Sequence, residues 1–257
     1  MKGLLRLCRA AIVAVVGFTH APVLAAQSQD SACPSEPTRL VVLGDSLADG
    51  LWGSLNRSYA RCPTVEVVRL TAVSDGLAKT SDAGWLKRYA RVATKLDTRA
   101  SDIVLVQIGA NDITTIRNGS IRESFASDTW TQIYAGRVVG LTRALKARTA
   151  QVIWFGLPVV GNTKLEAPYQ AISKLQRGAV KSAGGRFIDI HELTKFGTGD
   201  FSMNGPFAGR IRQLRAPDKV HFTKSGYDFV AHLVLNDLAR LMLARDRRAS
   251  LQNVTLQ

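Results

Sequence analysis

The sequence predicts an α/β domain with a mostly parallel sheet of five strands and helices on both faces. Short apolar runs rich in β-branched residues alternate five times with longer segments of helical periodicity. Hydrophobic residues make up 46% of the chain, enough for a full core, which argues against global disorder. After residue 30, no apolar run approaches the roughly 20 residues that span a bilayer. We therefore expect one folded domain, residues 38–247, followed by a C-terminal tail, 248–257.

Each expected strand is a short apolar run that stops at glycine, proline or polar residues. The strands are expected at Arg39–Leu43, Val65–Leu70, Asp102–Ile108, Val152–Phe155 and Phe187–Ile190. Between and after them, we expect helices at Ser46–Ala60, Trp85–Leu96, Asp128–Arg148, Pro168–Ala183 and Thr223–Arg245. Asp128 is the expected N-cap of the third helix. The segment Lys195–Ala216 is rich in glycine, and we expect an irregular loop that shapes a pocket.

The N-terminus has the three parts of an export signal. Lys2, Arg6 and Arg9 precede a short apolar stretch, and small residues around Ala25 offer a cleavage site. We expect residues 1–25 to be a signal peptide and 26–37 an extended lead-in, which places the protein in the periplasm or outside the cell. The alternative is an uncleaved anchor.

Cleavage near Ala25 leaves two cysteines, Cys33 and Cys62. Each lies just before a strand, and the two strands are expected to be parallel neighbours. In an exported chain this arrangement favours a disulfide, and the alternative is a pair of free buried thiols.

The formal net charge of +14 would suit a partner that is anionic: a glycan, a phospholipid head group or a nucleic acid. The basic residues are scattered through the helices, however, without the interleaved aromatics of a nucleic-acid groove. We expect a solvated basic surface and no nucleic-acid partner.

Ser46 follows the first buried strand at the point where a helix begins. In open α/β sheets, ligands bind beyond the carboxyl ends of the strands, so Ser46 is placed to be a nucleophile. His221 is the better candidate for its base, because Asp218 lies three residues earlier and one turn can bring its carboxylate to the imidazole. His191, after the fifth strand, is the weaker candidate, and His232 is expected to pack or lie exposed on the last helix.

Acyl transfer also requires donors for an oxyanion. Asn111 follows the third strand, and Gly76 lies in the loop after the second, so both are expected at the edge that carries Ser46. We expect the Asn111 amide, the Gly76 N–H and the Ser46 N–H to be these donors. Alternatively, Asn111 and Gly76 are ordinary turn residues.

Four segments occur in the order of the four blocks of the SGNH, or GDSL, hydrolase family, and the chain resembles that family over nearly all of its expected mature length. They are Gly44-Asp45-Ser46-Leu47, the loop at Gly76, Gly109-Ala110-Asn111-Asp112 and Asp218-Lys219-Val220-His221. The resemblance is closest to an exported bacterial subgroup that is mostly uncharacterised. It implies a flavodoxin-like three-layer αβα sandwich, serine esterase or acyl-transfer chemistry, and no metal or cofactor.

By residue, the resemblance implies Ser46 as nucleophile, Asp218 and His221 as the rest of the triad, and Gly76 and Asn111 as oxyanion donors. The second block departs from the family, because Ser74-Asp75-Gly76 lacks the usual asparagine. The Gly-x-Ser-x-Gly elbow, the P-loop, the Rossmann glycines and the His-Glu-x-x-His zinc motif do not occur.

The expected function is hydrolysis of O-acyl esters, above all O-acetyl esters, on cell-envelope or exported glycans. Three alternatives remain: an O-acyltransferase with the same triad, a lipid esterase of the lysophospholipase type, and a non-catalytic glycan-binding protein. The sequence sets neither acyl length nor oligomeric state.

Overall fold

The computed structural model describes residues 33–93, 101–149 and 151–255. Its centre is a parallel sheet in the order β2-β1-β3-β6-β7, the strand order of flavodoxin-like folds. The strands are β1 (Thr38–Gly44), β2 (Val65–Thr71), β3 (Ser101–Gln107), β6 (Gln151–Phe155) and β7 (Arg186–Ile188). The five-stranded parallel sheet predicted from the sequence is confirmed.

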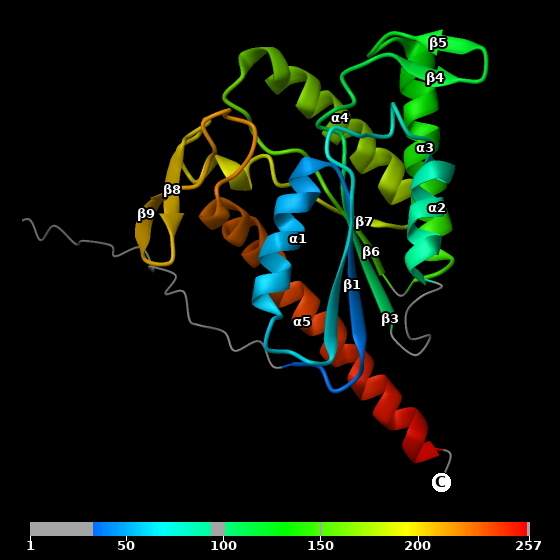
Figure 1. Ribbon diagram of the computed structural model, residues 1–257, viewed down its shortest axis with the longest axis vertical. Coiled ribbons are helices and arrows are strands. Elements are labelled where there is room, and N and C mark those ends of the chain that lie inside the picture. The colour runs from blue at the N-terminus through cyan, green and yellow to red at the C-terminus, as the bar shows by residue number, and fades with distance from the viewer. Residues whose placement is uncertain (1–32, 94–100, 150, 256–257) are drawn as a thin grey trace, which may run out of the picture.

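Five helices cover the two faces of this sheet (Figure 1). On one face, α1 (Ser46–Ser58) packs against α5 (Lys224–Thr255). On the other face, α3 (Asp128–Lys146) packs between α2 (Asp82–Ala93) and α4 (Thr163–Ser182). The architecture is therefore the expected three-layer αβα sandwich. None of the described helices is long and apolar enough to cross a membrane.

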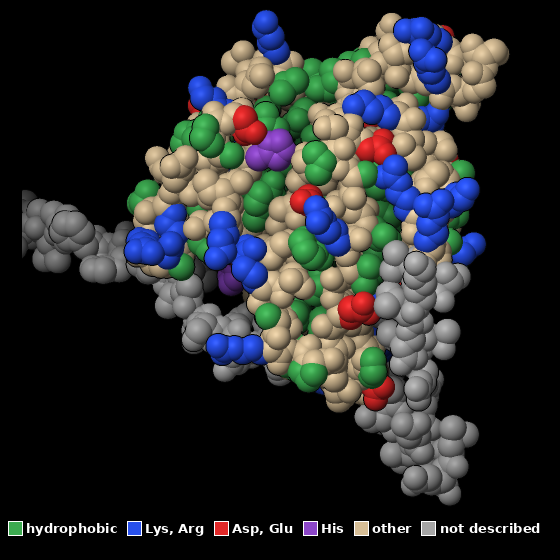
Figure 2. Space-filling model, viewed as in Figure 1, with side chains coloured by type: hydrophobic (Ala, Val, Ile, Leu, Met, Phe, Trp, Pro, Cys, Tyr) green, Lys and Arg blue, Asp and Glu red, His purple; other side chains and the backbone are tan. Residues whose placement is uncertain are grey.

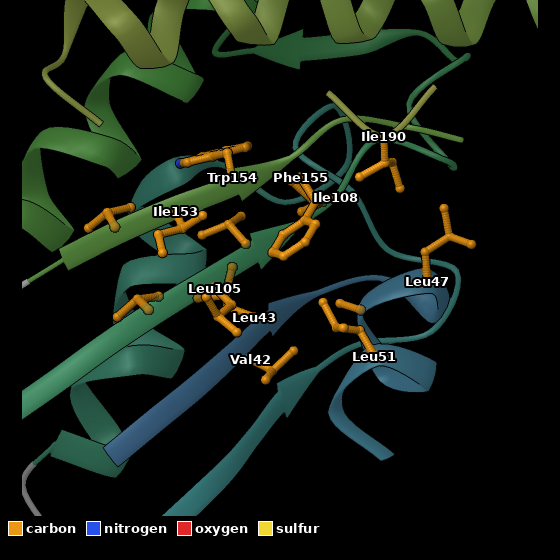
Figure 3. Close-up of a cluster of buried hydrophobic side chains, with 14 of the residues drawn as sticks. Val42, Leu43, Leu47, Leu51, Leu105, Ile108, Ile153, Trp154, Phe155 and Ile190 are labelled. Carbon is orange, nitrogen blue, oxygen red and sulfur yellow. The ribbon is translucent and has the colours of Figure 1, made fainter. Parts of the chain in front are cut away.

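The core lies along the central strands. Every residue of β1 is buried, as expected for a strand covered on both faces. Val42 and Leu43 meet Leu105 of β3, Trp154 and Phe155 of β6 in one apolar cluster (Figure 3). Burying a side chain of this size stabilises the fold by about 1.5–3 kcal/mol. This rigid centre fixes the ends of the strands, where the candidate site lies.

The starts of three helices differ from expectation, the first being α2, which begins at Asp82 and not at Trp85. The N-cap of α3 is Ser127, whose hydroxyl accepts the Trp130 N–H, and not Asp128. Helix α4 begins at Thr163, and Pro168 lies inside it. Asn162 caps α4 by accepting the Lys164 N–H at 3.1 Å. This cap precedes the proline, so the expected start at Pro168 is wrong.

Two hairpins lie in segments for which no strand was predicted. They are β4 (Ile116–Asn118) with β5 (Ile121–Glu123), and β8 (Asn204–Phe207) with β9 (Arg210–Gln213). In the second hairpin, Ala208 and Gly209 form the turn with φ of 51° and 75°, as a two-residue type I′ turn requires. The segment Lys195–Ala216 is thus more regular than expected. A short 3-10 helix, η1 (Leu193–Lys195), lies at its start.

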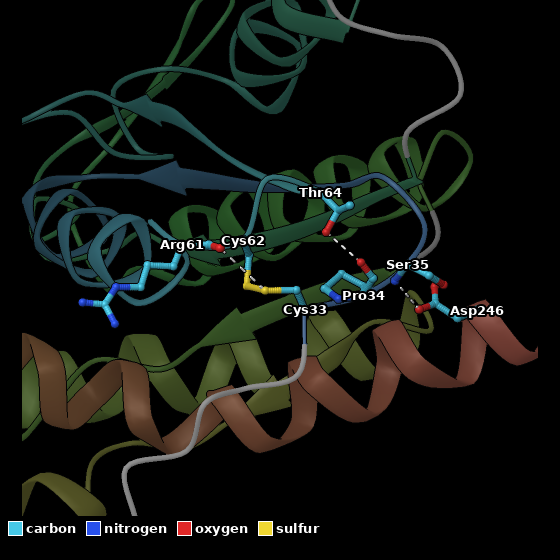
Figure 4. Close-up of a disulfide and its surroundings, with 7 residues drawn as sticks. All are labelled: Cys33, Pro34, Ser35, Arg61, Cys62, Thr64 and Asp246. Carbon is cyan, nitrogen blue, oxygen red and sulfur yellow. Dashed lines mark hydrogen bonds between the residues drawn. A yellow bond between two sulfur atoms is a disulfide. The ribbon is translucent and has the colours of Figure 1, made fainter.

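Cys33 and Cys62 form a disulfide, with their Cα atoms 5.3 Å apart (Figure 4). This confirms the predicted bridge and excludes two free thiols. Beside it, the Thr64 hydroxyl donates to the Pro34 carbonyl, and the Ser35 N–H donates to Asp246 of α5. The bridge and the Thr64 bond therefore fasten the segment before β1 to the segment before β2, and the Ser35 bond fastens it to the last helix.

The structure tests the expected C-terminal segment but not the expected N-terminal one. The signal peptide, 1–25, and most of the lead-in, 26–32, lie outside the described residues. At the other end, α5 runs on to Thr255, beyond the expected helix end at Arg245 and through most of the expected tail.

Candidate active site

Ser46 is the first residue of α1, directly beyond the carboxyl end of β1. The turn that presents it is tight: Gly44 has φ +147°, and a Cβ there would lie 1.8 Å from the Gln107 carbonyl oxygen of β3. Asp45 then caps α1 by accepting the Leu47 N–H at 2.9 Å. Only glycine fits at position 44. Ser46, two residues later, is partly exposed at the edge of the sheet.

Three side chains expected to act together are hydrogen-bonded in a row. Ser46 Oγ lies 2.7 Å from His221 Nε2, and His221 Nδ1 lies 2.6 Å from Asp218 Oδ2. The other carboxylate oxygen, Oδ1, accepts the N–H groups of Val220 and His221 at 3.0 and 2.9 Å. The chain of contacts has the order nucleophile, base and orienting carboxylate that activates a serine.

Asp218 is held in its charged form. Burial alone would raise the pKa of Asp218, but three hydrogen bonds outweigh it, from the Val220 N–H, the His221 ring and the His221 N–H. The pKa of this carboxyl therefore lies below its usual range. A charged Asp218 fixes Nδ1 of His221 as the donor, so Nε2 is free to accept the Ser46 proton.

The Asn111 side chain and the Ser46 backbone are the expected oxyanion donors that keep an N–H without a hydrogen-bond partner in the described part of the chain. The Asn111 amide gives one hydrogen to the Asp75 carbonyl at 3.1 Å, which orients it, and no described residue accepts its second N–H. Within the residues that the structure describes, no acceptor takes the Ser46 N–H. This N–H is at the first position of a helix, where the backbone donors have no partner inside the helix.

Gly76 has a different environment from the one expected. Its N–H donates to the carboxylate of Asp75 at 2.8 Å, so this donor is engaged within the loop. The glycine has a packing reason as well: a Cβ at Gly76 would lie 2.0 Å from Asp112 Oδ1. The geometry therefore explains Gly76 by close approach to Asp112 and gives no support to its expected oxyanion role.

Two buried aspartates, neither of them expected as a catalytic residue or an oxyanion donor, join the loops that carry the expected site. Oδ2 of Asp45 accepts the N–H groups of Gly109 and Ala110, both at 3.0 Å, which ties the Ser46 turn to the Asn111 loop. Complete burial raises the pKa of Asp45 to about 7. Since Asp45 touches both loops, it fixes the position of the Ser46 turn relative to the Asn111 loop.

Asp112 performs the same task on the neighbouring loop. Its carboxylate accepts the N–H groups of Leu77 and Ala78 at 3.1 and 2.8 Å, and the Tyr134 hydroxyl at 2.8 Å. Burial raises the pKa of Asp112. The only sequence signal for it was its place next to Asn111, which does not reveal these partners.

The other two histidines of the described chain lie in other settings. His191 Nε2 is 2.5 Å from Glu166, and its Nδ1 is 3.1 Å from Glu192, so both ring nitrogens face carboxylates. His232 is exposed on α5, as expected. Of these three histidines, His221 is therefore the one placed as a base for Ser46.

Two surface features bear on ligands. An apolar groove of about 590 Å³ runs between α3 and α4, and no triad residue lines it. Lys and Arg side chains are spread over the face seen in Figure 2 and do not form a single stripe.

Among the described residues, no group of three or more His, Cys, Asp or Glu side chains is placed to hold a metal ion.

Known structures share this architecture. A lipase/acylhydrolase from Enterococcus faecalis superposes with a TM-score of 0.55 at 16% identity, over 79% of this chain and 95% of its own. A putative acylhydrolase from Bacteroides fragilis NCTC 9343 gives 0.52 at 18% identity, over 86% and 97%. A catalytic mutant of an acetylxylan esterase from Geobacillus stearothermophilus gives 0.51 at 15% identity, over 78% and 94%. These likenesses confirm the fold of GDSL hydrolases.

No curated protein matches the chain. A family model described as "Protein of unknown function (DUF459)" matches residues 39–237, which include every residue of the row Ser46, His221 and Asp218. The chain belongs to this family and has the fold of the GDSL hydrolases.

Proposed function

We propose that this protein is an exported serine esterase that removes O-acyl groups, above all O-acetyl groups, from cell-envelope or exported glycans. The observation that carries the proposal is the contact row Ser46 Oγ–His221 Nε2–Nδ1–Asp218, with separations of 2.7 and 2.6 Å. Each contact is short enough for proton transfer or orientation without rearrangement.

The reaction proceeds in two acyl-transfer steps. Ser46 Oγ attacks the ester carbonyl while His221 Nε2 takes its proton, and the negative charge that develops on the carbonyl oxygen is received by the Asn111 amide and the Ser46 N–H. His221 then protonates the leaving alcohol, and an acyl-serine remains. Water attacks the acyl-serine with His221 again as base, which releases the acid and restores Ser46. Gly76 would join the donors only if its N–H left Asp75.

The openness of the site supports the proposed substrate class. The side chains of Asp218 and His221 remain 51% and 37% exposed, so the triad lies at the surface. A surface site admits a short acyl group on a large polymer, whereas the apolar groove between α3 and α4 is lined by other residues. The acetylxylan esterase of the same fold acts, by its name, on an acetylated polysaccharide.

Export is the second part of the proposal. The disulfide between Cys33 and Cys62 fits an oxidising compartment, and the first residues have the pattern of a signal peptide. Mass spectrometry of the periplasmic and secreted fractions should find a mature N-terminus near Ala26. A full-length chain retained in the membrane would instead support the uncleaved anchor.

The decisive test of the chemistry is hydrolysis of p-nitrophenyl acetate by the purified protein. Ser46→Ala and His221→Ala should each lower kcat by at least ~10³-fold. Ser58→Ala, on the far end of the same helix, and His191→Gln are matched controls that should keep the wild-type rate. Equal turnover by wild type and Ser46→Ala would reject the catalytic proposal.

Assays with different substrates distinguish the proposed function from its three alternatives. Acetyl esters and acetylated glycans should be better substrates than butyryl or octanoyl esters, and the reverse order would indicate a lipid esterase. Faster turnover with excess acceptor sugar, together with an acylated sugar product, would indicate an acyltransferase. Saccharide binding without hydrolysis, unchanged by Ser46→Ala, would indicate a binding protein.

A further inference from the structure

Arg215 is a charged side chain with no exposed surface. It lies three residues before Asp218, directly after the β8–β9 hairpin. Taking a guanidinium out of water is unfavourable by several kcal/mol unless each N–H finds a partner. Within the part of the chain that the structure describes, no carboxylate forms a salt bridge with Arg215. Its partners are backbone carbonyl oxygens instead.

Four carbonyl groups surround the guanidinium, and three of them belong to the loop that carries His221. Nη2 donates to Val220 at 2.7 Å and more weakly to Lys219 at 3.5 Å, and Nε donates to the His221 carbonyl at 3.3 Å. The fourth bond, from Nη1 to the Val159 carbonyl at 2.6 Å, reaches the segment after β6. Arg215 thus joins the His221 loop to the segment that follows strand β6.

Two aromatic rings complete the enclosure. The guanidinium carbon lies 4.3 Å from the centre of the Phe222 ring and 5.0 Å from that of Phe201. Phe201 belongs to the segment Lys195–Ala216, which was expected to shape a pocket. One role of this segment is therefore to cover Arg215 and exclude water from its hydrogen bonds.

The loop that Arg215 holds is tight and partly strained. The Ala216 N–H donates to the His221 carbonyl at 2.9 Å, which closes the loop on itself. Lys219 has φ +61°, a left-handed conformation that is unfavourable for a lysine by about 1 kcal/mol or more. Arg215 donates to the Val220 carbonyl of this loop, and it shares the carbonyls of Lys219 and His221 with the N–H groups of Gly161 and Ala216, which donate at 3.0 and 2.9 Å.

We propose that Arg215 is a positioning residue that holds the backbone of Lys219–His221 so that the His221 ring meets Ser46 and Asp218. The proposal rests on the proposed esterase function. Lysine cannot replace it, because one ammonium group cannot make the divergent planar set of bonds to Val159, Val220 and His221. Burial lowers the pKa of Arg215 to about 10, so the group stays charged at neutral pH.

The test compares Arg215→Lys and Arg215→Met with Arg210→Met, a control that removes an exposed arginine of β9. Misplacing a catalytic group by about 1 Å lowers the rate by ~10²-fold. We expect kcat for p-nitrophenyl acetate to fall by about that factor in both Arg215 variants, with KM changed less than about twofold. Arg210→Met should match wild type.

A proton NMR measurement reads the position of His221 without any substrate. The proton between His221 Nδ1 and Asp218 should give a far-downfield signal in wild type and in Arg210→Met, absent from His221→Ala. The signal should be shifted or lost in Arg215→Met, and methylguanidinium added to Arg215→Ala should restore it together with part of kcat. If Arg215→Met does not fold, the NMR signal and kcat of Arg215→Lys test the positioning role instead.

The two proposals fail in different ways. If wild type hydrolyses no ester, the esterase function fails, and the NMR signal still tests the role of Arg215. If folded Arg215 variants keep both the signal and kcat within about twofold of wild type, Arg215 has only a packing role and the inference is overturned.

Discussion

The buried carboxyl of Asp45 predicts that the protein loses stability as the pH rises toward neutrality. Burial raises the pKa of Asp45 from an ordinary 3.8 to about 7. The folded protein therefore keeps this proton at pH values where the unfolded chain has lost it. The stability contributed by the proton is fully present below about pH 4 and is lost as the pH rises through 7. Burial also raises the pKa of Asp112, which adds to the trend.

The size of the effect follows from the two pKa values. Between pH 5 and pH 7, Asp45 alone should lower the free energy of unfolding by about 2 kcal/mol. The carboxyls whose pKa lies below its usual range, such as Asp218, change the stability only below about pH 5 and do not oppose this trend. Urea unfolding of the disulfide-intact protein at pH 5, 6 and 7 measures the slope.

Two variants isolate the carboxyl. Asp45→Asn should reduce the change in the free energy of unfolding between pH 5 and pH 7 by about 2 kcal/mol. This holds whatever the substitution does to the stability at any single pH. Ser46→Ala changes the adjacent residue without changing a titrating group, so it should keep the wild-type slope. A wild-type stability that is flat or rises from pH 5 to pH 7, or a slope that Asp45→Asn leaves intact, would refute the reasoning.

Three further substitutions test the bridge, the oxyanion donor and the glycine loop. Replacing Cys33 and Cys62 by serine should lower the free energy of unfolding by about 3–4 kcal/mol, since the bridge closes a separation of 29 residues, and an unchanged urea midpoint would contradict this. Asn111→Ala should lower kcat by ~10²–10³-fold at similar KM, and an unchanged kcat rejects the donor role. Gly76→Ala should destabilise by about 1–3 kcal/mol, because its Cβ would lie 2.0 Å from a carboxylate oxygen, whereas Gly136→Ala, where nothing lies within 4 Å, should not.

The sheet and the contact row of Ser46, His221 and Asp218 were predictable because their signals lie in residue types along the chain. A central parallel strand is buried on both faces, and this is why Val41–Leu43 is a continuous apolar run in the sequence. Asp218 and His221 are three residues apart, and a single turn brings their side chains together. Because the carboxyl ends of parallel strands meet at one edge, the sequence also predicted which loops face Ser46.

The supporting contacts were not predictable in the same way. Asp45 and Asp112 bind backbone N–H groups of distant loops, and every residue except proline has such a group. Arg215 likewise binds carbonyl oxygens, which leave no mark in the sequence. Residue types revealed the groups that would react, whereas the contacts that position them depend on how the loops pack.

The helix boundaries show where local rules compete. Pro168 is typical of a first turn, yet the asparagine cap at Asn162 begins α4 earlier. The β8–β9 hairpin turns on Ala208-Gly209, and alanine at a position with φ of 51° is not a typical turn signal.

The central claim is that Ser46 is a nucleophile activated by His221. It is tested most directly by reaction with a fluorophosphonate, followed by intact-mass and peptide mass spectrometry. One adduct per chain should form on the peptide that contains Ser46, slowly in His221→Ala and not at all in Ser46→Ala. Labelling of Ser46→Ala at the wild-type rate, or no adduct on wild type, would contradict the claim.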